Sequence, residues 1–182
     1  MTDLIQRAAE LRAAQRMEEA LETITRAATL YPDDPRAAFG LAQISFESWR
    51  PAAALFAHAR TLVPGNLDII RNHALAMAAE GDGGEAQRLL EDTLKSAPGW
   101  ADGHRILAVQ RITAGDDAEF DRSYAVAVKA EPQNAALWMG WFQLYAQRKD
   151  WDRAATVLRD ALDQNPGNRA FELAKLYLAS ET

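Results

Sequence analysis

The side chains best suited to metal binding or proton transfer are three histidines, and the sequence spreads them widely. His58, His73 and His104 lie in different parts of the chain, and none belongs to an HxD, HExxH or HxxxH arrangement. Ligands that hold one metal ion from neighbouring turns need such a spacing, so a histidine site is not expected. The simpler interpretation places His73 in the core and the other two at the surface or at an interface.

Other motifs that carry chemistry are missing as well. The sequence has no GxxxxGK[ST] or GxGxxG loop for phosphates and no GxSxG nucleophile elbow. The glycine-rich run 81–84 is expected to be a turn between helices. Acidic pairs stand at predicted helix starts or turns, where carboxylates cap a helix or complement its dipole: Glu18–Glu19, Asp33–Asp34 and Asp116–Asp117. We therefore expect no catalytic residue, no metal, no cofactor and no enzyme activity in this chain.

The bulk composition narrows the class of protein. The 182 residues carry a formal net charge of −6 and no cysteine. Disulfides are thereby excluded, and an acidic chain is a poor partner for nucleic acid. No apolar run reaches the roughly 18 residues that span a membrane. The amino-terminal stretch carries Asp3, Glu10, Glu18 and Glu19, so it predicts an amphipathic helix and not a secretion signal. The expected location is cytoplasmic, with no nucleic acid and no membrane as partner.

Five prolines divide the chain at nearly equal intervals of 32, 34, 34 and 34 residues. They are Pro32, Pro64, Pro98, Pro132 and Pro166. Such a period is typical of stacked copies of one supersecondary unit. Upstream of each proline, small, large and small residues recur at i, i+4 and i+7, as Ala20, Ile24 and Ala27 do before the first. This spacing predicts one face of a helix, which the proline then ends.

A second apolar pattern follows each of the first four prolines by nine residues, for example at Leu41–Ala42, so each copy is predicted to be helix, turn, helix. Gly81 and Gly115 fall in the turns, where glycine readily supplies a left-handed backbone. The residues that recur at these positions in each copy resemble the repeat of the tetratricopeptide repeat (TPR) family over nearly the whole chain. The copies are about 1–34, 35–66, 67–100, 101–134 and 135–168, with a last helix at 169–180. The resemblance implies an all-α, right-handed α-solenoid (superhelix) in which residues 1–182 form a single TPR domain.

The second copy is two residues short, and the loss falls near residues 48–51. We expect a tighter turn there, with Pro51 in the first turn of the following helix. Trp49, Trp151 and Met17 each precede the small residue of a second helix by three positions. Their side chains are therefore expected to fill the space at the hairpin turns.

Two phenylalanines replace small residues at predicted helix crossings. Phe120 is expected opposite Ala108, and Phe142 opposite Ala154, so that each crossing keeps one large and one small partner. Trp138 matches the structural tryptophan of the TPR family, which implies a place in the core.

In the TPR family the first helix of each copy lines a concave groove, and the resemblance implies that function lies there. The predicted groove residues are Phe39, Gln43, Phe46, Arg71, Asn72, Leu75, Arg105, Val109, Ile112, Met139 and Gln143. Arg71 and Arg105 are expected to be near neighbours on adjacent copies. Because arginine pairs bidentately with carboxylates, the groove suits a peptide with a carboxylate and apolar anchors. Alternatively, part of this row is ordinary packing between helices, and the arginines are solvated.

The expected function is a non-catalytic protein–protein interaction scaffold that binds a protein or peptide in this groove. One alternative is the interaction region of a larger enzyme, because residues 99–120 resemble TPR segments that precede iron- and 2-oxoglutarate-dependent oxygenase domains. The catalytic part would then lie outside this chain. Another is a self-associating assembly protein, a homo-oligomer formed through the C-terminal helix. That helix carries a second apolar stripe at Leu173, Leu176 and Tyr177, and Trp100 is expected to be exposed.

Overall fold

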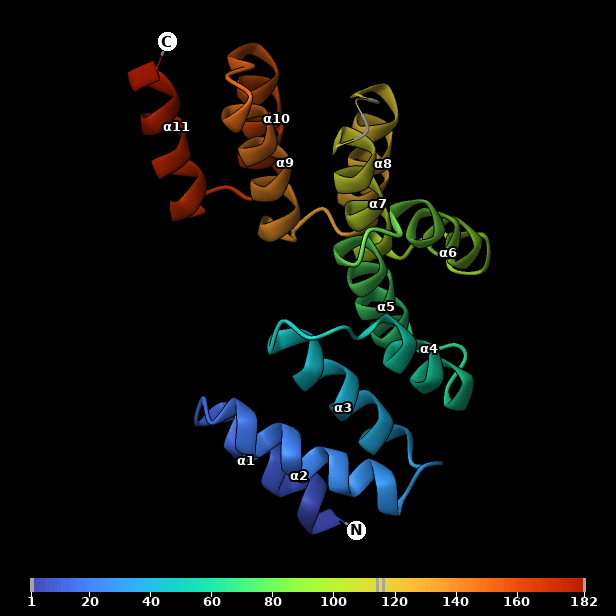
Figure 1. Cartoon of the computed structure of the whole chain (residues 1–182). Helices are drawn as coiled ribbons and strands as arrows, with labels where there is room; N and C mark the ends of the chain where they lie inside the picture. Colours follow the sequence, from blue (N-terminus) through green and yellow to red (C-terminus); the bar gives the residue numbers. More distant parts are fainter. Residues whose placement is uncertain (1, 114, 116, 182) are drawn as a thin grey trace. The chain divides into compact units, whose positions relative to one another are not determined.

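The computed structural model is helical, without a strand among the residues that it describes, which are 2–113, 115 and 117–181. Side chains are described for all of these except Thr2, Ile112, Thr113 and Asp117. The helices are α1 (Thr2–Ala13), α2 (Met17–Leu30), α3 (Pro35–Glu47), α4 (Ala53–Leu62), α5 (Leu67–Ala79), α6 (Gly83–Ser96), α7 (Ala101–Thr113), α8 (Asp117–Ala130), α9 (Ala135–Gln147), α10 (Trp151–Gln164) and α11 (Arg169–Glu181) (Figure 1). The predicted all-α class is confirmed. The chain forms two compact units, residues 1–95 and 96–182, and a single domain of five repeats stays a prediction.

Each proline of the repeat follows the end of a helix, as its spacing predicted. The preceding helices end at Leu30, Leu62, Ser96, Ala130 and Gln164, always two residues before the proline. Proline has no amide hydrogen to donate and disfavours a helical conformation in the residue before it. The predicted helix face is buried, since Ala20, Ile24 and Ala27 are at most 1% exposed.

The second residue after the proline caps the next helix in four copies. Its side-chain oxygen accepts a hydrogen bond from a backbone amide of the first turn at 2.9–3.1 Å. These caps are Asp34, Asn66, Asn134 and Asn168. The fourth copy has Trp100 in this place, and its ring lies so close to α7 that a Cβ on Gly103 would meet it at 2.2 Å. The prediction that Trp100 is exposed is therefore wrong, because the ring is half-buried against this glycine.

Within residues 1–95, α1 packs against α2, α3 against α2 and α4, and α4 against α5. One apolar cluster joins α1, α2 and α3 and includes Leu11 and Ile24. A second cluster joins α3, α4 and α5 and includes Phe56. The helix pairs therefore bury their apolar faces against the neighbouring pair, as a repeat architecture requires.

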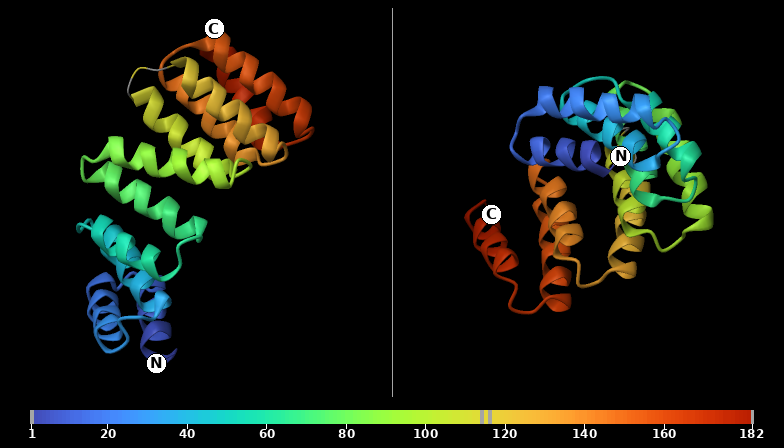
Figure 2. Two further views of the ribbon diagram at one scale, coloured as in Figure 1. Left: turned by 90° about the vertical axis from the view of Figure 1, so that its right-hand side faces the viewer. Right: turned by 90° about the horizontal axis from the view of Figure 1, so that it is seen from below.

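Within residues 96–182, α7 pairs with α8 and α9 with α10, and α11 lies beside α10 (Figure 2). Their common core contains both phenylalanines at the crossings, Phe120 and Phe142, together with the small residues expected opposite them. Trp138 is 6% exposed, and its Nε1 donates to the carbonyl oxygen of Pro132 at 2.8 Å. Its predicted place in the core is confirmed.

Among the described residues, each hairpin turn has a residue with a left-handed backbone. These residues are Gln15, Trp49, Gly81, Gly115 and Lys149. The two glycines confirm the prediction, since only glycine adopts this conformation without strain. Trp49 occupies the same place with φ 57° and is 96% exposed, so its predicted role in filling the turn is wrong. Met17 and Trp151 differ because they begin helices and are half-buried.

The two residues missing from the second copy come from the start of α4, not from the turn. This helix has 10 residues, whereas α2 and α10 each have 14. The amide of Arg50 donates to the carbonyl of Ser45, as the amide of Asp150 donates to that of Tyr145 in a full-length copy. The expected tighter turn is therefore wrong, and Pro51 lies outside the helix, before its first residue.

A carboxylate from the end of α5 replaces the missing first turn of α4. Glu80 Oε1 accepts hydrogen bonds from the backbone amides of Ala52 and Ala53 at 2.7 and 2.8 Å. Amides at a helix N-terminus have no partner within the helix, and a negative charge there complements the helix dipole.

Replacing Glu80 with alanine should lower the free energy of unfolding of residues 1–95 by about 1–2 kcal/mol, because two amides lose their acceptor. Chemical denaturation followed by circular dichroism measures this. Glu85→Ala, an exposed change on α6, is the matched control and should stay within about 0.5 kcal/mol of the parent. Equal losses in the two variants would show that α4 does not depend on this cap.

Candidate functional site

The predicted groove residues of α3 form a half-buried aromatic wall. Phe39 and Phe46 lie one on each side of Gln43 along the helix, and all three are half-buried. Both rings meet the buried Phe56 of α4 edge to face, with centroids 6.0 and 6.3 Å apart. The expected alternative is therefore correct in part, because one side of this row is packing within the hairpin. The remainder of both rings is partly accessible to solvent.

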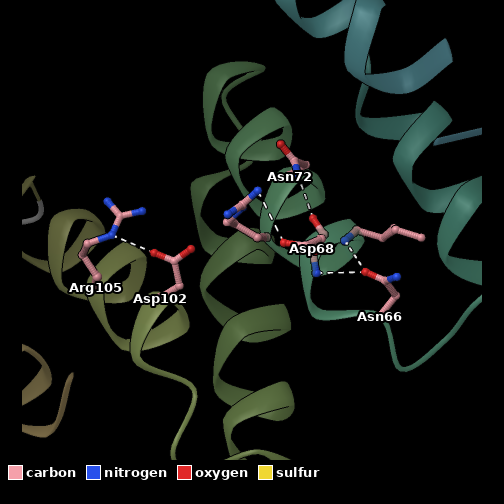
Figure 3. A network of polar contacts seen from close by, with 7 residues as sticks. Asn66, Asp68, Asn72, Asp102 and Arg105 are labelled. Atoms are coloured by element: carbon pink, nitrogen blue, oxygen red, sulfur yellow. Dashed lines mark hydrogen bonds and ion pairs between the residues drawn. The ribbon is translucent and has the colours of Figure 1, made fainter. Parts of the chain in front are cut away.

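On α5 the predicted residues are tied to the first turn of their own helix. Arg71 forms an ion pair with Asp68 at 3.5 Å, and the Asn72 side-chain amide donates to the Asp68 carbonyl at 2.7 Å (Figure 3). Asn66 caps the same turn through the amide of Asp68. The Arg71 side chain is 35% exposed, and Leu75, one turn further along, is half-buried. The guanidinium is thus held over the start of α5 and remains accessible to solvent.

On α7 the second arginine has the same local arrangement. Arg105 Nε donates to Asp102 Oδ1 at 2.9 Å, and each side chain is 35% exposed. Figure 3 shows this contact at the start of α7. The nearby phenol of Tyr124 is buried, and burial raises its pKa. Its oxygen lies 3.1 Å from where a Cβ on Gly140 would stand, so a bulkier residue on α9 would press on this core.

The other predicted groove residues within 96–182 differ in exposure. Val109 is 36% exposed and Gln143 is exposed, whereas Met139 is partly buried against the core. Ile112 lies on α7, but its side chain is outside what the structure describes. Arg71 and Arg105 belong to different compact units, so their expected closeness stays a prediction.

The arrangement can bind carboxylates without holding them permanently. Ion pairs between partly exposed side chains contribute only about 0–1 kcal/mol, so a partner carboxylate can share or displace either aspartate at little cost. Arginine offers five N–H donors in a planar fork, and bidentate pairing with an incoming carboxylate adds geometric selectivity. Partly accessible apolar residues follow each arginine by four positions, Leu75 on α5 and Val109 on α7.

The histidines have structural surroundings. His58 Nε2 lies 3.2 Å from the carbonyl oxygen of Pro32, and His104 Nε2 lies 3.0 Å from that of Pro98. His104 thus takes the place that Trp138 has in the next copy. His73 is 5% exposed, and burial, together with the charge of Arg60, lowers its pKa below the usual range. The described residues contain no group of histidines and acids placed to hold a metal ion.

Sequence reasoning missed one polar cluster in residues 96–182. Asp121 on α8 accepts hydrogen bonds from Trp141 Nε1, at 3.1 Å, and from the Tyr145 hydroxyl, both on α9. Burial raises the pKa of Tyr145, and the hydrogen bond to Asp121 raises it further. The Trp141 ring stacks on Tyr124 with centroids 5.6 Å apart. No local spacing signals this cluster, because its members meet only when the hairpins pack.

Comparison with known proteins points to one family. A family model described as tetratricopeptide repeat matches residues 3–44 and 135–178. No curated protein matches the chain. Among the helices in the described ranges, none has the length and apolarity required to cross a membrane.

Solved structures of TPR proteins share the fold at low sequence identity. A thermophilic TPR protein of Thermus thermophilus is 21% identical, with a TM-score of 0.71 over 99% of this chain and 97% of the other. YrrB, described as a TPR protein with an unusual peptide-binding site, is 18% identical, with a TM-score of 0.62 over 94% and 90%. Pseudomonas aeruginosa pilF is 14% identical, with a TM-score of 0.72 over 98% and 82%.

Proposed function

We propose that this chain, which is a tetratricopeptide repeat protein, is a scaffold that binds a peptide segment of a partner protein through the first helices of its hairpins. The TPR fold supports a role in protein–protein interaction. We further propose that the predicted groove residues on α3, α5, α7 and α9 contact the peptide. We also expect the protein to be cytoplasmic and to have no catalytic activity.

The observation that carries the proposal is the repeated arginine–aspartate arrangement on two first helices. In each, an arginine 35% exposed pairs with the aspartate three residues before it. Accessible apolar surface accompanies both, as Leu75 on α5 and Val109 on α7. We therefore expect a peptide that presents a carboxylate and at least one apolar side chain.

A second candidate function, the interaction region of a larger enzyme, uses the same surface for a different purpose. Its support is the resemblance of residues 99–120 to segments that precede oxygenase domains. Within these residues, His104 contacts the carbonyl of Pro98, which is a structural role. The enzyme alternative depends on residues outside this chain, whereas the arginine–aspartate arrangement lies within it, so the peptide-binding proposal is preferred.

Selection from a displayed peptide library, followed by fluorescence anisotropy with a selected peptide, tests the proposal. Arg71→Glu or Arg105→Glu should weaken binding at least about tenfold, because a buried or partly buried carboxylate would face a negative charge. Replacing the peptide carboxylate by an amide should have a similar effect. The two variants also show which compact unit holds the site.

Arg88→Glu is the matched control. Arg88 on α6 pairs with Glu85 three residues earlier, as the groove arginines pair with aspartates, but it lies on the second helix of a hairpin. Its reversal should leave binding unchanged. If all three reversals weakened binding equally, the effect would come from overall charge and the proposed site would be wrong.

A further inference from the structure

The last helix buries one face and leaves the opposite face apolar. Phe171 and Ala174 belong to the core of residues 96–182 and are 0% and 8% exposed. Leu173, Leu176 and Tyr177 are 58%, 68% and 48% exposed, and the Tyr177 ring also meets Trp151 of α10 edge to face with centroids 6.3 Å apart. These three residues, which we call the outer stripe of α11, follow the i, i+3, i+4 spacing of a helix face that packs against another helix. Exposed apolar residues in such a group mark an interaction surface.

The first and last residues of α11 carry charges that oppose its dipole, although Glu172 in the first turn complements it. Arg169 is the first residue of the helix and Glu181 the last, and both are exposed. A cation at the N-terminus and an anion at the C-terminus each oppose the helix dipole. Arg169 lies four residues before Leu173, and Glu181 four residues after Tyr177, so both flank the outer stripe. A partner that offers the opposite charge at each end would remove both conflicts.

A second α11 in antiparallel orientation offers this complement. With a twofold axis at the level of Lys175, residue 173 faces residue 177 of the other copy, and residue 169 faces residue 181. Leucine then meets tyrosine and arginine meets glutamate, each twice. Each charged end also lies beside the oppositely charged end of the other helix dipole. A parallel pair would instead place arginine against arginine and glutamate against glutamate.

We infer that two copies of this chain associate through antiparallel packing of α11, with the outer stripe at the centre and Arg169–Glu181 ion pairs at both ends. The contact is isologous and therefore closes as a dimer. It goes beyond the proposed peptide binding, because none of the predicted groove residues lies on α11. Loss of the dimer and loss of peptide binding are thus separable results.

Analytical ultracentrifugation of the whole chain, from micromolar to millimolar concentration, tests the inference. The parent protein should dimerise, and Leu176→Lys should raise the dissociation constant at least about thirtyfold, since two leucines leave the interface. Leu30→Lys is the matched control, because Leu30 is 55% exposed on α2, and it should leave the dimer unchanged. Both positions are exposed, and circular dichroism should show unaltered helix content. A monomer over the whole range, or a dimer that tolerates Leu176→Lys, would overturn the inference.

Charge reversal tests the orientation separately. Arg169→Glu alone and Glu181→Arg alone should each weaken the dimer about fivefold, because like charges then face each other. The double variant, or an equal mixture of the two single variants, should restore the affinity of the parent. In a parallel pair, or in an apolar contact of another kind, neither single reversal would matter, and the antiparallel arrangement would be rejected. Capture of a different protein by α11 without self-association would likewise contradict it.

Discussion

Replacing Phe56 with alanine should lower the free energy of unfolding of residues 1–95 by about 3–5 kcal/mol. The ring is fully buried in the cluster that joins α3, α4 and α5. It is also the common aromatic partner of Phe39 and Phe46. Its loss leaves a cavity and removes two edge-to-face contacts, each of which contributes about 0.5–1.5 kcal/mol beyond area burial. The wall of the candidate site should therefore loosen together with the core.

Chemical denaturation measures the overall loss, and hydrogen exchange locates it. Exchange should accelerate in α3 and α4, whereas α9 and α10 should change little, because repeat stability depends on neighbouring interfaces. Leu30→Ala, an exposed change on α2, is the control and should stay within about 0.5 kcal/mol. A loss below about 1 kcal/mol for Phe56→Ala would show that the phenylalanines of α3 do not depend on this ring.

Replacing Phe120 with alanine should cost a similar amount, about 3–5 kcal/mol, in residues 96–182. All four other copies carry alanine at this position, and a change toward a consensus residue commonly stabilises a protein. Here the opposite is expected, because Phe120 is fully buried and its ring meets Tyr124 and Tyr145 at 5.2 and 5.5 Å. The small Ala108 in the same core cannot fill the space that the ring leaves.

The midpoint and slope of urea denaturation report this loss. Val126→Ala on the same helix is the matched control, since Val126 is 38% exposed, and it should change stability far less. Unchanged or increased stability of Phe120→Ala would mean that the consensus residue packs equally well. The pairing of Phe120 with the small Ala108 at this helix crossing would then contribute nothing to stability.

The sequence predicted helix positions well where a local rule decided them. Proline ended five helices two residues before itself, and glycine marked two left-handed turns. The second copy shows the limit of that reasoning. Trp49 has the same distance to the following alanine as Trp151, yet the two differ in exposure because α4 lacks its first turn. The cap supplied by Glu80 is a contact between hairpins that no local spacing reveals.

The sequence predicted on which helices the candidate site residues lie, but it did not predict which side chains they contact. The spacing of the repeats placed Arg71 and Arg105 on the first helix of their copies, and both lie there in the structure. It did not indicate that each pairs with an aspartate three residues earlier, although that spacing is visible in the sequence. The cluster around Asp121 depends on the packing of α8 against α9 and could not be derived from either helix alone.

Site-specific photo-crosslinking tests most directly whether the first helices carry the binding surface. A photoreactive residue would replace Gln43 on α3, Gln143 on α9 or, as the control, the exposed Gln164 on α10. With a peptide selected for binding to the whole chain, we expect crosslinks from position 43 or 143 and none from position 164. Crosslinks from position 164 alone would place the peptide on a second helix and would contradict the proposed function.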